Sequence, residues 1–247
     1  MNILLSGACG RMGRCVAEYC GTQQDCRIVA GVDRRADSAW HDFPVVSDFD
    51  QLERFPVELL IDFSSPDATQ RALLYSAQHQ IPCVICTTGL TAPVCHTMQF
   101  CARLIPVFHS ANMSVAAAVL QELCRRTQEI LGPEWDIDIL EQHHAGKTDA
   151  PSGTALALGQ VLCQDRQLCN EQECTIPRRH SEVVFHSLRA GGSAGEHLVQ
   201  FASADEVLRL SHLVFDRRVF AAGAIAAARF LIGKPPGLYN MKDLIKK

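Results

Sequence analysis

The run ILLSGACGRMG, residues 3–13, decides the fold that we predict for this chain. Ile3–Ser6 has the apolar character of a short buried strand, and a glycine-rich turn and an amphipathic helix follow it. Gly7, Gly10 and Gly13 give the spacing G-x-x-G-x-x-G, a variant of the fingerprint that lets a backbone approach a dinucleotide pyrophosphate. Because this spacing alone is a weak signal, the strands that follow have to support it.

The second predicted strand ends at an acid, where such a fold holds an adenosine ribose. Arg27–Val32 is mostly apolar, and Asp33 follows it, 20 residues after Gly13. Arg34 and Arg35 come next, and a guanidinium there suits the 2′-phosphate of NADPH. The predicted cofactor is therefore NADPH or NADH, and this pattern supports either.

Three more apolar runs continue the alternation of strands and helices. Val57–Phe63, Ile81–Cys86 and Leu104–Phe108 are predicted strands, and residues 114–131 are a predicted helix. The alternation indicates a Rossmann-like, doubly wound parallel sheet of the α/β class, which holds ligands at the carboxyl ends of its strands. Small polar residues follow these three strands: Ser64 and Ser65, Thr87 and Thr88, and Ser110 and Asn112.

The run IDILEQHHAGKTDAPSGTALALGQV, residues 137–161, holds the densest group of reactive side chains. It is predicted to be a strand, a polar loop and a helix with Pro151 in its first turn. At that helix start, Ser152, Gly153 and Thr154 would offer backbone N–H groups and hydroxyls to an anion.

Three ionisable side chains precede this helix start: His143, His144 and Lys147. Each alone is more often a surface or structural residue, but their concentration favours function. Lys147 supplies a cation, and the two histidines titrate near neutral pH, so the loop suits protonation of a bound carboxylate compound. No His, Cys and carboxylate set has the spacing of metal ligands, so no metal is predicted.

The second half of the chain is predicted to form another sheet. Glu182–Arg189, His197–Ala202 and Val207–Phe215 are strand-like and would join Ile137–Glu141 in it. The glycine-rich turn at residues 190–195 predicts that the first two are antiparallel neighbours. Because such a sheet has open edges, self-association is one way to cover them.

The remaining segments give no catalytic signal. Gln167–Arg179 is predicted to be a polar connection, and Asp216–Leu231 an alanine-rich amphipathic helix. Cys83 and Cys86 would point to opposite faces of one strand, unlike a redox pair. The twelve cysteines are therefore predicted to be mostly buried free thiols in a reducing cytoplasm.

Composition narrows the function classes further. A formal net charge of -4 argues against nucleic-acid binding. The first residues have no basic segment, and nowhere do 18 apolar residues follow one another, so neither secretion nor membrane insertion is predicted.

The pattern E-x-H-H-x-x-K-x-D-x-P-S-G-T-A, from Glu141 to Ala155, resembles the signature of the 4-hydroxy-tetrahydrodipicolinate reductases, also called dihydrodipicolinate reductases. The resemblance extends from Gly7 to Met241. Cys86 and Met113 stand where the family usually has glycine and phenylalanine, and Ala145 and Gly146 where bacterial relatives often have arginine and histidine. The segments around Arg189 and His197 also resemble family motifs near the substrate.

The resemblance implies a discontinuous dinucleotide-binding domain, residues 1–113 and 217–247, and a substrate-binding and oligomerisation domain of α+β type, residues 114–216, with a mixed or antiparallel sheet. It implies hydride transfer from NADPH or NADH to a cyclic dicarboxylate in lysine and diaminopimelate biosynthesis, in a cytoplasmic homotetramer. His143 would be the general acid, assisted by Lys147. The substrate would be held by His144, Lys147, Ser152, Gly153 and Thr154. The cofactor would be held by Gly7, Ala8, Cys9, Gly10, Arg11, Met12, Gly13, Asp33, Arg34, Phe63, Ser64, Cys86, Thr87, Thr88, Ser110, Ala111, Asn112 and Met113.

Two alternatives stay open. One is another amino-acid dehydrogenase on this scaffold, of the aspartate or diaminopimelate type, which should not need the pattern at residues 141–155. The other is a nucleotide-sensing regulatory protein, which would bind the cofactor without turnover.

Overall fold

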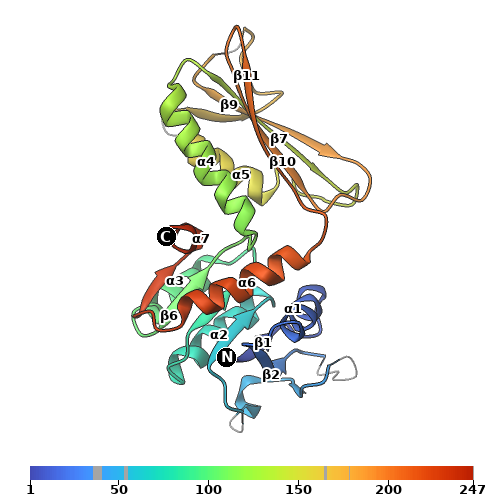
Figure 1. The fold of residues 1–247 in the computed structure, drawn as a ribbon, viewed down its shortest axis with the longest axis vertical. Coiled ribbons are helices and arrows are strands. Elements are labelled where there is room, and N and C mark those ends of the chain that lie inside the picture. Colours follow the sequence, from blue (N-terminus) through green and yellow to red (C-terminus); the bar gives the residue numbers. More distant parts are fainter. Residues whose placement is uncertain (36–40, 53–54, 164–165, 178, 247) are drawn as a thin grey trace. The chain divides into compact units, whose positions relative to one another are not determined.

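The computed structural model describes residues 1–35, 41–52, 55–163, 166–177 and 179–246. The chain forms two compact units: Met1–Ser114 with Arg217–Lys247, called unit 1, and Val115–Asp216, called unit 2 (Figure 1). The last part of the chain therefore belongs to the same unit as the first. Within the described ranges, no helix combines the length and the apolar character needed to cross a membrane.

Unit 1 is built on a seven-stranded parallel sheet in the order β12-β6-β5-β4-β1-β2-β3. Its strands are β1 (Asn2–Ser6), β2 (Arg27–Val32), β3 (Val45–Val46), β4 (Leu59–Asp62), β5 (Cys83–Ile85), β6 (Pro106–His109) and β12 (Gly237–Tyr239). The strand order reverses beside β1, the place where doubly wound sheets hold ligands. The predicted Rossmann-like parallel sheet is confirmed.

Helices cover both faces of this sheet. They are α1 (Arg11–Gly21), α2 (Pro66–Gln78), α3 (Ala92–Cys101) and α6 (Arg218–Leu231), with a short α7 (Met241–Ile245) and a 3-10 turn at Phe49–Gln51. Leu4 and Leu60 belong to an apolar cluster with Leu73 of α2 and Met98 of α3. The alternate strand residues, such as Ile3, point to the other face and are equally buried. Burial on both faces explains why these strands are nearly continuous apolar runs.

Unit 2 is a five-stranded mixed sheet in the order β11-β10-β7-β9-β8. Its strands are β7 (Asp136–His143), β8 (Gln167–Asn170), β9 (Glu182–Arg189), β10 (Glu196–Ala202) and β11 (Val207–Leu213). Helices α4 (Val115–Leu131) and α5 (Gly153–Cys163) pack on each other, and residues of both share an apolar core with β7, β9 and β10 (Figure 1). The predicted mixed sheet is therefore confirmed.

Two sequence predictions about this sheet were wrong. β9 and β10 are not neighbours, because β7 lies between them, parallel to β9 and antiparallel to β10. β7 has the apolar residues that best fill a central position, and the six-residue turn between β9 and β10 is long enough to pass its end. The segment predicted to be only a connection contains β8, whose sequence QLCN buries a single residue, Cys169, and so shows little strand pattern.

Candidate active site

The reactive residues of unit 2 continue the buried face of two paired strands. Side chains alternate along a strand, so one face of β7 presents a stripe of buried residues: Ile137, Ile139, Glu141 and His143. On β10, His197 is also buried and lies directly opposite Glu141 in the antiparallel register. At this end of the sheet, the core stripe changes from aliphatic to ionisable side chains.

Glu141 is the centre of this group, and its side chain has no exposed surface. One carboxylate oxygen contacts Nδ1 of His143. The other accepts hydrogen bonds from Nη2 of Arg189 at 2.6 Å and from the N–H of Ser152 at 3.3 Å. Burial alone would raise the pKa of Glu141, but the hydrogen bonds from Arg189, Ser187 and His143 outweigh it, so the pKa lies below its usual value. Glu141 is therefore a buried carboxylate ion.

His143 has one ring nitrogen fixed and the other directed elsewhere. Burial lowers the pKa of His143 below its ordinary value, and the hydrogen bond and charge of Glu141 oppose this shift. Because Nδ1 faces Glu141, Nε2 is the nitrogen left to exchange a proton with another molecule. A Cβ at Gly195 would lie 2.9 Å from Nε2, so the glycine keeps space beside this atom.

The start of α5 is attached to the same carboxylate. The hydroxyl of Ser152 accepts the N–H of Ala155 at 3.2 Å and so caps the helix. Ser152 is only 2% exposed, and its own N–H is donated to Glu141, contrary to our expectation of an N–H without a partner. Pro151 lies before the helix, not in its first turn, and the bond that precedes it is cis. Gly153 is exposed and Thr154 half-buried.

The loop between β7 and α5 supplies the two other candidates for substrate binding. His144 is half-buried, and its N–H is donated to the carbonyl of Ser193 at 3.0 Å. The ammonium of Lys147 lies 2.8 Å from both carboxylate oxygens of Asp149 and holds the pKa of Asp149 below its usual value. Arg189 also donates to the carbonyl of Asp149 at 2.6 Å. The structure thus brings His143, Lys147 and Ser152 together around Glu141 and Arg189, which our sequence analysis named only as parts of family motifs and not as site residues.

Carboxylate and imidazole side chains such as these also occur together at metal centres. Donor atoms of Glu141, His143 and His197 all lie within 4.8 Å of one another. Glu141, however, already accepts the guanidinium of Arg189, and its other oxygen faces His143. These contacts suit a proton shared between acid and imidazole, since a divalent cation would be repelled by the guanidinium.

Unit 1 has a groove at the carboxyl ends of β1 and β2, with a volume of about 220 Å³. Seven predicted cofactor residues line it: Gly7, Cys9, Gly10, Asp33, Arg34, Phe63 and Ser64. The groove is also lined by Arg35 and Ser65, which the sequence placed beside the cofactor, and by four residues to which it gave no such place: Ser6, Val32, Ser47 and Ala68. Lining residues such as Ser47 come from a segment with no motif, so only the folded chain identifies them.

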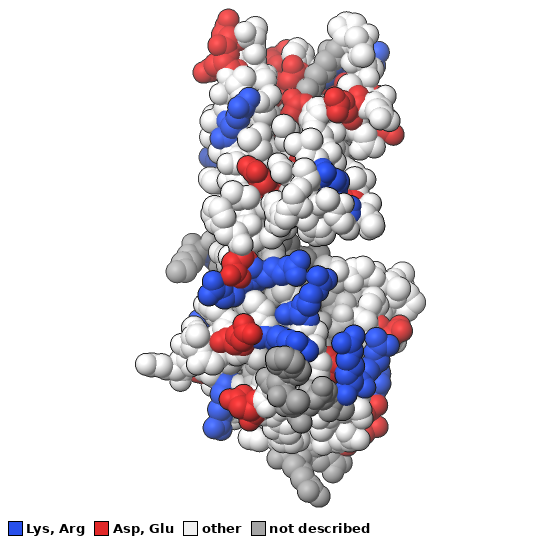
Figure 2. Space-filling model, turned by 90° about the vertical axis from the view of Figure 1, so that its right-hand side faces the viewer, with Lys and Arg blue, Asp and Glu red and all other residues white. Residues whose placement is uncertain are grey.

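The geometry of the glycine turn fits a dinucleotide. Gly7 has a positive φ of 77°, and a Cβ at Gly13 would lie 2.2 Å from the carbonyl oxygen of Gly7, so both positions require glycine. Asp33 accepts the N–H of Cys9 at 2.9 Å and so fixes the turn against the end of β2. Lys and Arg side chains gather on the face of unit 1 that is seen in Figure 2, which favours an anionic ligand.

The remaining predicted cofactor residues lie at or beside the strand ends but do not line the groove. Ala8, Arg11, Met12 and Gly13 belong to the turn and the start of α1, and Cys86, Thr87, Thr88, Ser110, Ala111, Asn112 and Met113 follow β5 and β6. Cys86 and Met113 are 5% and 2% exposed, respectively, so their side chains are core residues. Asp62, which had no predicted role, is fully buried and accepts the hydroxyls of Thr69 at 2.6 Å and Thr87 at 2.7 Å.

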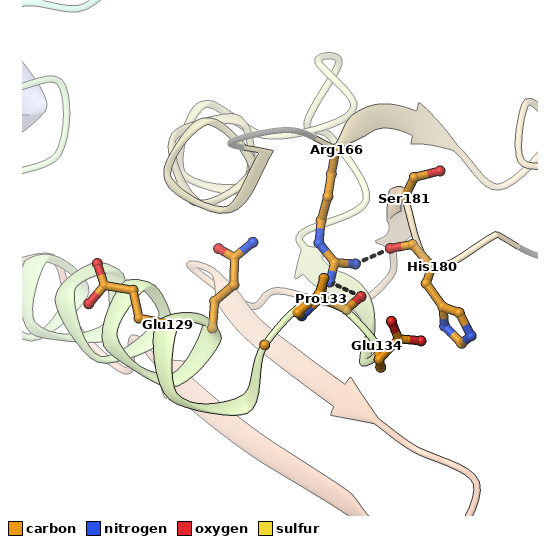
Figure 3. Close-up of a pocket in the computed structure, with 8 residues that line it drawn as sticks. Glu129, Pro133, Glu134, Arg166, His180 and Ser181 are labelled. Carbon is orange, nitrogen blue, oxygen red and sulfur yellow. Dashed lines mark hydrogen bonds between the residues drawn. The ribbon is translucent and has the colours of Figure 1, made fainter.

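Another hollow, of about 530 Å³, lies in unit 2 beside the last turn of α4 (Figure 3). The guanidinium of Arg166 donates to the carbonyl oxygens of Pro133, at 2.8 Å, and of His180. Arg166 thereby ties the end of α4 to the segment before β9. None of the candidate site residues lines this hollow.

Comparisons with known proteins cover both units. The family model described as "Dihydrodipicolinate reductase, N-terminus" matches residues 1–113, and "Dihydrodipicolinate reductase, C-terminus" matches residues 116–245. The 4-hydroxy-tetrahydrodipicolinate reductase of Caldanaerobacter subterraneus subsp. tengcongensis is 40% identical over 252 residues, covering 100% of this chain and 99% of the relative. The protein of that name from Clostridium novyi is 36% identical, with 99% and 98% covered.

Solved structures agree on the fold. The dipicolinate-bound dihydrodipicolinate reductase of Paenisporosarcina sp. TG-14 has a TM-score of 0.80 at 19% identity and covers 97% of each chain. A meso-DAP dehydrogenase mutant from Clostridium tetani has a TM-score of 0.58 at 13% identity and covers 100% of this chain and 96% of its own, so it shares the fold alone. The two family models together span almost all of this chain, which belongs to the dihydrodipicolinate reductase family.

Proposed function

We propose that this protein reduces 4-hydroxy-tetrahydrodipicolinate to tetrahydrodipicolinate with NADH or NADPH, in lysine and diaminopimelate biosynthesis. The observation that best supports this function is the buried pair of Glu141 and His143 beside the start of α5. This pair places a proton donor beside a candidate binding site for carboxylates in the loop and helix start at residues 144–154, which we call the carboxylate seat. A cyclic dicarboxylate that must be protonated needs both a proton donor and such a site.

We propose His143 as the general acid. The reduced nicotinamide supplies a hydride, and water is lost from the 4-hydroxy compound. The added electron pair must end on a protonated atom, and Nε2 of His143 is the nitrogen free to donate that proton. Glu141 holds Nδ1 of the ring and stabilises the imidazolium before transfer. Lys147 stabilises the negative charge that develops during hydride addition, or serves as a second donor.

The substrate carboxylates are proposed to bind at the loop and the start of α5. Gly153 begins the helix and is exposed, and Thr154 follows it, so an anion there meets the positive end of the helix dipole. Lys147 supplies a cationic partner by leaving Asp149 for the substrate, and His144 supplies a ring N–H donor. Ser152 has its polar atoms engaged within the protein, so its proposed part in binding is to fix the helix start.

We propose that Asp33 binds the adenosine ribose and that the protein therefore prefers NADH to NADPH. A carboxylate accepts ribose hydroxyls and repels a 2′-phosphate, whereas Arg34, beside it in the groove, permits NADPH to bind as well. Asp33→Ala is expected to raise the KM for NADH roughly tenfold or more, since a charge-assisted hydrogen bond is lost. The KM for NADPH should change less or fall, and initial rates with each cofactor measure both.

Arg34→Ala is the matched variant and should raise the KM for NADPH alone. An equal rise in the KM for NADH and for NADPH in Asp33→Ala would mean that Asp33 acts only through the backbone N–H groups of Cys9 and Arg35 that it accepts.

We propose that the chain forms a homotetramer through the sheet of unit 2. β11 is an edge strand, and three of its apolar side chains are 40–52% exposed: Val207, Leu208 and Leu213. An open edge with exposed apolar residues favours pairing with another copy. Light scattering of the purified protein is expected to give the mass of four 27.2 kDa chains, and the mass of one chain would refute this proposal.

The reaction can be tested by the absorbance of the reduced nicotinamide. The substrate is generated in place from pyruvate and aspartate semialdehyde by a dihydrodipicolinate synthase. Rapid oxidation that needs every component is expected. Cofactor binding without oxidation would support a nucleotide sensor, and oxidation only with other amino-acid precursors would support another dehydrogenase.

A further inference from the structure

His197 is a buried histidine of unit 2 that the proposed chemistry does not use. It is 4% exposed, and it lies directly across from Glu141 in the pairing of β10 with β7. Its ring meets the ring of His143 edge to face, with centroids 5.2 Å apart and planes at 75°. One side of the His143 imidazole is therefore closed by another imidazole.

The other side of His197 reaches the start of α5. Its Nε2 lies 2.9 Å from the hydroxyl of Ser152, the same hydroxyl that caps the N–H of Ala155. The N–H of Ser152 is in turn donated to Glu141, which holds His143. These contacts close a ring of four residues: His143, Glu141, Ser152 and His197.

Burial, followed by the charge of His143, lowers the pKa of His197 to about 4. A neutral imidazole at this place adds no charge beside the acid. It also fills space that water would otherwise enter. A neutral His197 can hold His143 and Ser152 in place without competing for the proton that His143 donates.

We propose that His197 is a positioning residue, which holds the ring of His143 and the carboxylate seat at the start of α5 in one fixed arrangement. This inference rests on the proposed function of that site. Without the Nε2 contact, Ser152 and the helix start would shift relative to β7, so the substrate carboxylate and the acid would no longer match. Misplacement on the scale of an ångström is enough to lower a rate by about 10²-fold.

The test uses the full-length protein, with dipicolinate as a competitive probe of the carboxylate seat. His197→Ala is expected to raise the inhibition constant of dipicolinate roughly tenfold and to lower kcat by a similar factor. His197→Gln can still place an amide N–H near the hydroxyl of Ser152, so it should recover most of the dipicolinate affinity. His180→Ala replaces an exposed histidine of the same unit and should match the unaltered protein.

A double-mutant cycle separates this role from simple packing. Ser152→Ala also loses the cap on Ala155, so it should weaken dipicolinate at least as much as His197→Ala. The double variant should be little worse than Ser152→Ala, because both single changes break the contact between Ser152 and His197. The dissociation constant of NADH, which binds to unit 1, is the control for folding. Additive losses, or losses that His197→Gln does not recover, would overturn the proposal.

The pH profile gives an independent readout. The groups that act on His143 are Glu141 from β7, Arg189 from β9, His197 from β10 and Lys147 from the loop. Because removal of the His197 ring admits water, the pKa of His143 should rise and the alkaline limb of kcat/KM should move to higher pH in His197→Ala. An unmoved limb with unchanged dipicolinate affinity would contradict the inference. If the unaltered protein bound dipicolinate but turned over no substrate, the proposed function would fail while the binding test of His197 remained valid.

Discussion

Replacing His143 with glutamine is expected to lower kcat by about 10²–10⁴-fold, because general acids typically contribute that much. Glutamine has a similar reach and can keep a hydrogen bond to Glu141, but it cannot donate a proton to the product. Steady-state rates with saturating NADH measure the loss. The inhibition constant of dipicolinate should change little, since the carboxylate seat is formed by other residues.

His186→Gln is a suitable control, because His186 also faces a carboxylate of the same sheet, Asp138, at 2.9 Å, but lies outside the proposed site. A His143→Gln variant with kcat close to that of the unaltered protein would remove His143 from the role of acid. A loss of dipicolinate binding equal to the loss of rate would instead assign it to substrate binding.

Glu141→Gln is expected to lower kcat by roughly 10²-fold, since the ring of His143 loses the group that fixes it. The pH profile should change with a defined sign. The hydrogen bond and charge of Glu141 raise the pKa of His143 against the effect of burial, so their loss lowers that pKa further. An acid works only below its pKa, and the alkaline limb of kcat/KM should therefore move to lower pH.

This direction is opposite to the one expected for His197→Ala, so the two variants test each other. Glu141→Gln should also lower the unfolding temperature, because Arg189 loses the charge of its buried partner. If the alkaline limb of kcat/KM stayed in place in Glu141→Gln, the titrating acid would not be His143, whatever the loss of rate.

The fold of unit 1 could be predicted because its local sequence patterns, the apolar strands, the glycine turn and the helices, agree with the tertiary structure. The run at residues 3–13 has the apolar strand, the glycines that the turn requires and the following helix, and the structure has each of them. β2 spans the predicted Arg27–Val32. Strands buried on both faces are visible as apolar runs whatever their partners are, so the doubly wound sheet could be predicted without knowing the contacts.

The pairing of strands in unit 2 could not be predicted in the same way. A glycine-rich turn usually joins neighbouring strands, but the turn at residues 190–195 passes β7, and nothing local in the sequence encodes this insertion. The same pairing places His197 opposite Glu141 and Arg189 opposite His143. Arg189 and His197 come from strands far apart in sequence from His143. The motifs around them suggested a place near the substrate, but only the strand pairing shows that they surround Glu141 and His143.

The most direct test of the proposed reduction follows the hydride itself. NADH with deuterium at the transferred position is incubated with the protein and with substrate generated by the synthase, and the product is analysed by mass spectrometry. We predict one deuterium in each tetrahydrodipicolinate formed, with one NADH oxidised per product and almost no product from His143→Gln. Oxidation of the cofactor without deuterium in the product, or no oxidation by the unaltered protein, would contradict the proposal.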